Sequence, residues 1–166
     1  MDYDFMYVSG ARRTWAYGEH LSGIEDLRRL ETSCELRARS ADFTADVWTG
    51  YTGSIFYTCY RGSSLDVTRT AAQTRDLLAD YLRISMPIAG TSITRQSDRR
   101  FEARTGNATS LRFDTPFTIR GISEQIETVE IYVSMTDLAI WGIDSADLGG
   151  CTWPLSMRSL AIRDFV

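Results

Sequence analysis

Histidine, a common residue for acid–base catalysis and metal binding, is nearly absent from this sequence. His20 is the single one, and it precedes the first clear alternating stretch. A metal site in a barrel enzyme needs two or three histidines with a carboxylate, and a catalytic triad needs a histidine base. No glycine-rich stretch leads to a Lys-Ser or Lys-Thr pair that would hold phosphate. We therefore expect no metal, no cofactor and no catalytic residue.

Three carboxylates leave one catalytic arrangement open. Glu124, Glu127 and Glu130 are close along the chain, and a pair of carboxylates can act as acid and base in glycoside chemistry. Three acids near one strand are more often a solvated edge of a sheet.

Arginines and aromatic residues at strand positions point to recognition without reaction. A guanidinium fork pairs with a carboxylate or hydroxyl ligand, and aromatic rings form the flat walls of small-molecule pockets. The candidates are Arg69, Arg83 and Arg112 for the first role, and Trp48, Tyr57, Tyr81 and Tyr132 for the second. Arg69 stands out because it shares a strand face with Leu65 and Val67. The alternative is that the arginines face solvent and the rings fill the core.

Residues 81–134 contain the elements that must position these side chains. Short runs of alternating apolar and polar residues recur about every ten residues, a spacing typical of an antiparallel sandwich or small barrel. Turn signals separate them at Ala89-Gly90, Gln96-Ser97-Asp98, Thr105-Gly106-Asn107, Thr115-Pro116 and Arg120-Gly121. The sequence predicts a closed, mostly antiparallel sheet with a hollow interior that can hold a ligand.

Two strands of this region have clear faces. In the strand predicted over 80–88, Leu82 and Met86 lie on one face and Arg83 lies on the other. Pro87 predicts an edge strand or a bulge at its end. In 126–134, Val129, Ile131 and Val133 lie on one face, with Thr128, Glu130 and Tyr132 on the other.

Helical or irregular segments flank the strands. Residues 1–20 predict an arm that packs against the sheet or closes its mouth. Ser22 and Glu25 form a capping-box pattern for a helix over about 23–33. After Ser134 a short helix is expected, capped by Thr136, and Pro154 suits the first turn of another helix. That pattern runs to Val166 without ending, so we expect the protein to continue.

Composition narrows the classes of function. The chain has 166 residues, 43% of them apolar, and no apolar run approaches the roughly 18 residues of a membrane span. All 18 basic residues are arginine, the net charge is −4, and the pI is near 5.0. An acidic chain is a poor DNA binder by itself.

The compartment follows from the cysteines and the N-terminus. Cys34, Cys59 and Cys151 are odd in number and widely spaced, as expected of reduced thiols. The acidic start of the chain does not resemble a secretory signal. We expect a cytoplasmic protein.

Several segments together resemble a known family. Residues 67–70 (VTRT), 82–90 (LRISMPIAG), Gly106-Asn107, 113–116 (FDTP) and 133–135 (VSM) are similar to the sensor domain of AraC/XylS-type transcription regulators. The resemblance covers about residues 36–166. It implies a cupin-like barrel or jelly roll over 1–135 that binds a small effector, and a helical segment over 136–166 that forms a homodimer. DNA binding would belong to a separate helix-turn-helix domain, which this chain lacks.

The resemblance also implies roles for individual residues. Arg69-Thr70 matches the family position whose arginine enters the effector pocket, and Thr128, Glu130 and Tyr132 match positions that line it. The dimer contacts would come from Leu155, Ile162 and Phe165. Gly106-Asn107 replaces the usual Gly-Asp, a swap that turn geometry tolerates.

Three functions are therefore open at this point. The first is an effector-binding, non-enzymatic domain of a transcription regulator. The second is a metal-free cupin-like isomerase or lyase that acts on a small acid through Glu130 and an arginine. The third is a structural barrel with a filled interior.

Overall fold

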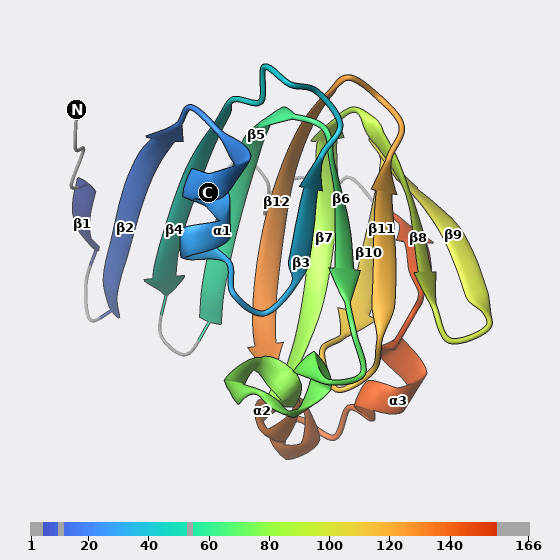
Figure 1. Cartoon of the computed structure of the whole chain (residues 1–166). Coiled ribbons are helices and arrows are strands. Elements are labelled where there is room, and N and C mark those ends of the chain that lie inside the picture. The colour runs from blue at the N-terminus through green and yellow to red at the C-terminus, as the bar shows by residue number, and fades with distance from the viewer. Residues whose placement is uncertain (1–4, 10–11, 53–54, 156–166) are drawn as a thin grey trace.

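Antiparallel strands form two facing sheets, with short helices at their margins (Figure 1). The computed structural model describes residues 5–9, 12–52 and 55–155, and for residues 5–16 and 52 only the backbone. Within these ranges, no helix is both long and apolar enough to cross a membrane. The predicted mostly-β fold with flanking helices is confirmed. The strands are β1 (Phe5–Ser9), β2 (Arg12–Leu21), β3 (Glu35–Ala38), β4 (Ala45–Thr52), β5 (Ile55–Ser63), β6 (Leu65–Arg69), β7 (Tyr81–Ala89), β8 (Thr91–Gln96), β9 (Arg99–Arg104), β10 (Asn107–Arg112), β11 (Phe117–Gly121), β12 (Gln125–Ser134) and β13 (Thr152–Pro154). The α-helices are α1 (Ile24–Leu30), α2 (Met135–Ile140) and α3 (Ser145–Leu148). Two 3₁₀ helices, η1 (Gln73–Arg75) and η2 (Leu77–Asp80), precede β7.

Long-range pairing places strands that are distant in sequence side by side. The larger sheet has the order β1-β2-β4-β5-β12-β7-β10-β13, and the smaller has the order β3-β6-β11-β8-β9. At the centre of the larger sheet, Tyr132 pairs with Phe56 on one side and with Arg83 on the other. Residues from three separate parts of the chain therefore meet on one inner surface.

The outer face of β7 and β12 is covered by the C-terminal segments. Val133 of β12 packs with Leu82 and with Leu138 of α2. Val129 packs with Met86, and Trp153 and Leu155 join that cluster from the C-terminal side. Because this outer face is apolar and covered, polar residues on β7 and β12 point to the space between the sheets.

Proline and glycine act as the sequence predicted, with one difference. Pro87 lies at a register shift between Glu127 and Thr128, which is the predicted bulge. It is not on an edge strand, since β7 lies between β12 and β10. Gly90 and Gly106 have φ of +81° and +90°, and both turns fall where predicted.

The main core lies between the sheets. Phe113, which follows β10, is 1% exposed, and its ring is 5.3 Å from that of Phe117. The other buried members are Leu21, Leu27, Cys34, Leu36, Phe43, Ala45, Val47, Tyr60, Leu65, Leu111 and Tyr132. This core fills only part of the space between the sheets, as the cavity described below shows.

Two predictions for the N-terminal region were wrong. The segment expected as an arm that packs against the sheet or closes its mouth is part of the sheet itself: it contains β1 and β2, and β2 pairs with β4. The capping box does not form, because the helix begins at Ile24 and its N-cap is Gly23, which has no side chain to accept a hydrogen bond. Ser22 lies one residue too early, and its N–H donates to Asp26 instead, at 3.3 Å.

The C-terminal predictions need similar correction. α2 forms as expected, but its N-cap is Ser134, whose Oγ accepts from the N–H of Thr136. Pro154 does not start a helix; it ends β13, where it pairs with Asn107. Leu155, one of the predicted dimer contacts, is partly buried and packs against the cluster of Met86 and Val129. Ile162 and Phe165 lie outside the described residues.

Candidate functional site

The two sheets enclose a cavity of about 660 Å³. Its walls are side chains of β2, β4, β5, β12, β7 and β10 on one sheet and of β3, β6, β11, β8 and β9 on the other, with α1 and η2 beside it. Figure 1 shows the two sheets facing each other, with α1 beside them. Small-molecule sites typically have volumes of roughly 300–1,000 Å³. The cavity is therefore of the right size for a small organic ligand.

Exposed lining residues mark the mouth of the cavity. Leu77 of η2 is 95% exposed, Tyr51 of β4 is 51% exposed, and Leu30 of α1 is 50% exposed. Arg83 and Phe113 also line the cavity, and they are only 7% and 1% exposed. A ligand entering between α1, η2 and β4 would reach these buried residues.

Aromatic rings in mutual contact form one wall. The ring centroid of Phe56 lies 5.0 Å from that of Tyr51 and 5.1 Å from that of Tyr132. Tyr132 in turn is 5.7 Å from Phe113, in an edge-to-face arrangement. The series runs from the mouth to the buried end and offers flat apolar surfaces to a ring-containing ligand.

A buried ion pair lies on the inner face of the larger sheet. Arg83 of β7 and Glu130 of β12 approach to 3.2 Å between Nη1 and Oε1. The Tyr132 hydroxyl donates to the other carboxylate oxygen of Glu130, at 2.9 Å. Burial raises the pKa of Tyr132 well above its usual value, so this hydroxyl remains a donor. Both oxygens of Glu130 are thus engaged, one by Arg83 of the neighbouring β7 and one by Tyr132 of its own strand.

The guanidinium of Arg83 is charged but incompletely bonded. Burial by itself lowers its pKa, but the neighbouring Glu130 and Tyr132 outweigh burial and raise the pKa above its ordinary value. The guanidinium carbon also lies 5.5 Å from the centre of the Phe117 ring. The Nε–H has no hydrogen-bond partner among the described residues. Buried donors are nearly always paired in folded proteins, so this nitrogen is a candidate contact for a ligand.

Glu31 and Cys34 bring further titratable groups to the cavity from the end of α1 and the loop after it. Burial raises the pKa of Glu31, although the N–H of Ser33 donates to its Oε1 at 2.7 Å. Burial also raises the pKa of the Cys34 thiol to about 12. A thiol with that pKa is protonated at neutral pH and is a poor nucleophile.

Hydroxyl groups complete the polar lining. Ser85 of β7 and Thr128 of β12 are buried, and their hydroxyl oxygens are 2.9 Å apart. Further threonines on the wall are Thr49, Thr58, Thr94 and Thr109. These groups can accept or donate, so they are compatible with many polar ligands.

Five of the nine predicted ligand-binding residues line this cavity. They are Tyr81, Arg83, Thr128, Glu130 and Tyr132. The structure brings them together on β7 and β12, which are paired neighbours.

Arg69, the residue singled out most strongly, is buried elsewhere. Its side chain is fully covered, and it pairs with Asp76 at 2.7 Å between Nη2 and Oδ1. Its Nε donates to the carbonyl of Phe113 at 2.7 Å, and Nη1 donates to the carbonyl of Ser33 at 2.6 Å. Because each of the three guanidinium nitrogens bonds a protein group and Arg69 does not line the cavity, we reassign Arg69 to a structural role.

The other three predicted residues lie outside the cavity lining. Trp48 and Tyr57 are on the outer faces of β4 and β5. The residues before them, Val47 and Phe56, point into the cavity. Arg112 is half-buried and forms a fork with Asp114, with 3.0 Å between Nε and Oδ1.

Sequence reasoning missed Phe56, Tyr60 and Phe113 on the aromatic wall, and Glu31. The alternation in β5 did separate Phe56 and Tyr60 from Tyr57, but both faces of that strand carry aromatic residues. No local signal could therefore decide which face points inward. Glu31 follows a helix, and no pattern in the sequence connects it with β7 or β12.

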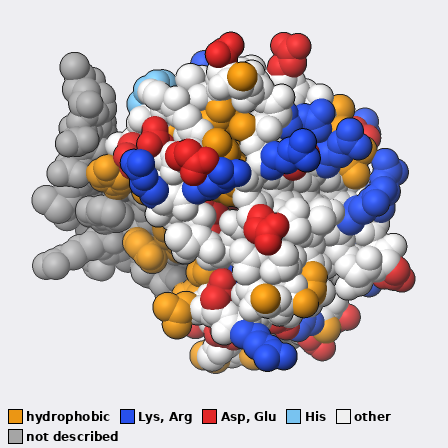
Figure 2. All heavy atoms as spheres, in the orientation of Figure 1, with side chains coloured by type: hydrophobic (Ala, Val, Ile, Leu, Met, Phe, Trp, Pro, Cys, Tyr) orange, Lys and Arg blue, Asp and Glu red, His pale blue; other side chains and the backbone are white. Residues whose placement is uncertain are grey.

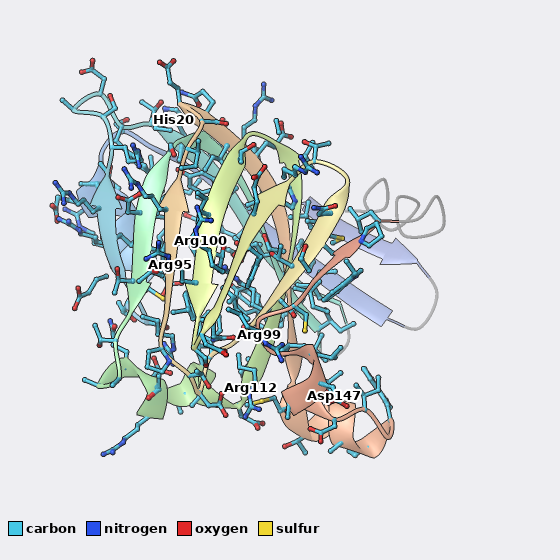
Figure 3. The ribbon with its side chains drawn as sticks, turned by 90° about the vertical axis from the view of Figure 1, so that its right-hand side faces the viewer. His20, Arg95, Arg99, Arg100, Arg112 and Asp147 are labelled. Atoms are coloured by element: carbon cyan, nitrogen blue, oxygen red, sulfur yellow. The ribbon has the colours of Figure 1, made fainter. Side chains whose placement is uncertain are left out.

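A separate group of arginines lies on the outer face of the smaller sheet (Figure 2). Arg95 of β8 and Arg100 of β9 are directly opposite each other across the strand pair (Figure 3). Both are exposed, and neither forms an ion pair with a described residue. They face solvent and do not contribute to the cavity.

The described residues contain no group of three or more His, Cys, Asp or Glu side chains that could hold a metal ion. The site therefore consists of an aromatic wall, one buried ion pair, a second carboxylate and several hydroxyls.

Comparison with known proteins identifies the fold. No family model matches the chain, and no curated protein matches it in sequence. The crystal structure of CuxR, an AraC-like transcriptional activator, matches with a TM-score of 0.75 and 13% identity. The chain has the fold of this AraC-like activator. The match covers 90% of the chain and 58% of CuxR.

The comparison confirms the resemblance inferred from the sequence at the level of the AraC-like fold. The predicted cupin-like jelly roll forms, although its two sheets are not closed into a barrel. Two further matches are weaker. The cupin domain of Cnp3 from Schizosaccharomyces pombe has a TM-score of 0.45 and 7% identity, over 66% of this chain and 75% of that domain. An HTH_3 family transcriptional regulator from Vibrio cholerae has a TM-score of 0.44 and 10% identity, over 54% of this chain and 50% of the regulator.

Proposed function

We propose that this chain is the effector-binding domain of an AraC/XylS-type transcription regulator, and that a small molecule binds in the cavity between the sheets. The observation that carries the proposal is the cavity of about 660 Å³, into which the aromatic wall and the incompletely bonded Arg83 are built. Leaving a buried donor unpaired destabilises a protein, and a ligand acceptor would remove that penalty.

The lining groups favour binding over catalysis. Glu130, the carboxylate that an isomerase or lyase would use as a base, is held by both Arg83 and Tyr132. Cys34 is protonated at neutral pH because burial raises its pKa to about 12. We therefore propose a site that recognises its ligand without transforming it, and we retain the isomerase or lyase as an outcome of the test below.

The regulatory part of the proposal rests on the AraC-like fold. The chain spans 58% of CuxR, so the complete regulator would carry further parts that bind DNA. Within residues 136–166, Leu155, Ile162 and Phe165 are the proposed homodimer contacts. The three free thiols and the acidic charge suit a cytoplasmic sensor that does not bind DNA by itself.

A thermal-shift screen with small acids, sugars and aromatic compounds tests the binding. A ligand at 100 times its Kd stabilises the folded state by about 2.7 kcal/mol. Thr58→Trp fills the cavity from β5, and Thr118→Trp makes the same change on the exposed face of β11. We expect compounds that stabilise the wild type and Thr118→Trp but not Thr58→Trp. Thr49→Trp provides a second blocked variant nearer the mouth, in case Thr58→Trp does not fold.

The outcomes distinguish the three functions that the sequence left open. Stabilisation that the cavity variants abolish, with the compound recovered unchanged by mass spectrometry, supports the sensor. A changed compound supports the isomerase or lyase. Stabilisation that persists in both blocked variants, or none with any compound, contradicts binding in the cavity.

A further inference from the structure

The charges that line the cavity do not form an anion-binding site. Arg83 is the single basic residue among the described residues of the lining, where the acidic residues are Glu19, Glu31, Asp76 and Glu130. Asp76 is bound by Arg69 from behind the cavity. Glu130 neutralises Arg83 at 3.2 Å. The remaining carboxylates, Glu31 and Glu19, give the lining an excess of negative charge.

A carboxylate ligand would meet this excess at close range. To reach Arg83 it would have to share the guanidinium with Glu130, whose position is fixed by the Tyr132 hydroxyl. Glu31 lies near enough to interact electrostatically with both Arg83 and Glu130. Two or three negative charges around one buried guanidinium repel each other more strongly than they would in water. This argues against the acidic effector that free arginines would have favoured.

The same residues leave hydrogen-bonding capacity for a neutral ligand. The Nε–H of Arg83 has no acceptor among the described residues, and the side chain is 8% exposed. Glu31 accepts from the N–H of Ser33 at Oε1, and the Ser33 side chain also bonds this carboxylate. A carboxylate has about four acceptor sites, so Glu31 can still accept a further bond from a ligand. The site therefore combines one unpaired donor and one available acceptor, beside aromatic rings that suit a flat molecule.

We propose that the cavity selects uncharged, ring-containing molecules that offer a carbonyl or hydroxyl oxygen to Arg83 and an N–H or O–H to Glu31, and that it discriminates against the corresponding carboxylates. This inference rests on the proposed function, because it names the class of effector for the same cavity. In this arrangement Glu130 sets the selectivity because it is the counter-ion of the charged Arg83 and leaves no net positive charge for an anion. Glu31 adds to it by repelling an anion and by accepting from a neutral donor.

Three ligands of one shape test the inference. Naphthalene-2-carboxamide, naphthalene-2-carboxylate and 2-(aminomethyl)naphthalene differ mainly in the charge of the group on the ring. Their Kd values are measured by NMR titration of the isotope-labelled chain at pH 7.5, with shifts mapped to cavity residues. We expect the carboxamide to bind at least tenfold more tightly than the carboxylate, and more tightly than the amine.

Two variants assign the selectivity to the named carboxylates. Glu130→Gln leaves Arg83 without its counter-ion, and we expect the carboxylate to become the tighter ligand of the two. Glu31→Gln retains both partners of the Arg83–Glu130 pair, and we expect it to reduce the preference for the carboxamide several-fold. It also provides the test if Glu130→Gln does not fold. Glu102→Gln, on the exposed face of β9, is the matched control and should leave all three Kd values unchanged.

The results separate failure of this inference from failure of the proposed function. Cavity binding in which the wild type prefers the carboxylate or the amine overturns the inference and leaves effector binding in place. The same holds if neither glutamate variant changes the order of affinities. If none of the three molecules perturbs cavity residues in the wild type, the inference is overturned, and the broader screen above then decides whether the cavity binds any ligand.

Discussion

Arg69 of β6 and Asp76, the N-cap of η2, form a two-pronged ion pair, with Nη2–Oδ1 at 2.7 Å and Nη1–Oδ2 at 3.0 Å. The same guanidinium donates to the carbonyls of Ser33 and Phe113 and lies 4.7 Å from the centre of the Phe113 ring. One side chain therefore connects a strand, a 3₁₀ turn and two loops. Arg83, the other buried arginine, has an Nε without a hydrogen-bond partner among the described residues. This difference distinguishes the structural Arg69 from Arg83, the proposed ligand contact.

Arg69→Ala should destabilise the fold by about 2–4 kcal/mol, because it leaves Asp76 and two carbonyl oxygens without their donor. Urea unfolding followed by circular dichroism measures the change. Arg95→Ala, which removes an exposed arginine without a described ion pair, is the control and should change stability by less than about 0.5 kcal/mol. A cost similar to that of the control would show that the network around Arg69 is dispensable.

Glu31 should make the protein less stable as the pH rises from acid to neutral. Burial raises its pKa above 4.5 in the folded state, with Glu130 of β12 adding to the rise and the Ser33 hydrogen bond and Arg83 of β7 opposing it. Between the unfolded and folded pKa values the folded state holds more protons, so its stability falls with pH. Glu31→Gln should remove this fall and be more stable relative to wild type at pH 7 than at pH 4.

Asp76 provides the comparison of opposite sign for that experiment. The hydrogen bonds from Arg69 lower its pKa below 3.8 despite the effect of burial. Its contribution is therefore present above the unfolded pKa and is lost as the pH falls through the folded pKa. Free energies of unfolding measured from pH 2.5 to 8 should show Asp76→Asn losing stability on the neutral side. Parallel curves for wild type and Glu31→Gln would contradict the role given to Glu31.

The same substitution on the two sheets should have opposite effects on stability. Arg100→Glu turns the like-charged pair with Arg95 into an opposite pair and should stabilise by about 0.2–1 kcal/mol. Arg61 lies between Asp46 and Glu127 on neighbouring strands, so Arg61→Glu should destabilise by a similar amount. Both differences should shrink in 1 M salt. Thermal melts at low and high salt measure both stability changes. If the two variants change stability in the same direction, the strand propensity of glutamate outweighs the charge interactions.

Gly62 of β5 is required by close contact with the main chain. A Cβ added there would lie 2.5 Å from both Ala45 Cα and the carbonyl oxygen of Thr44. Gly62→Ala should therefore destabilise by about 1–3 kcal/mol or more, since neither contact can move easily. At Gly23 an added Cβ meets nothing within 4 Å, so Gly23→Ala should lose only the N-cap preference, about 1 kcal/mol or less. Chemical denaturation of both variants compares the two costs.

The sequence by itself determined the strands, their turns and the direction of many side chains. Alternation has a period of two residues and is local, so β7 and β12 could be assigned with Arg83 and Glu130 on definite faces. Gly90 and Gly106 marked turns because their positive φ suits glycine. The recognition of an AraC-like fold also came from such patterns, and the CuxR comparison confirmed it.

Only the tertiary structure decided which face is interior and which partner each buried charge has. β5 is aromatic on both faces, so whether Phe56 or Tyr57 lines the cavity depended on the second sheet. Arg69 and Arg83 both point inward, yet every guanidinium nitrogen of Arg69 has a partner in Asp76 or two loops, whereas Nε of Arg83 has none among the described residues. These partners come from segments far apart in the chain or from turns with no periodic signal. A local pattern sets where a side chain points, whereas long-range packing sets what it meets there.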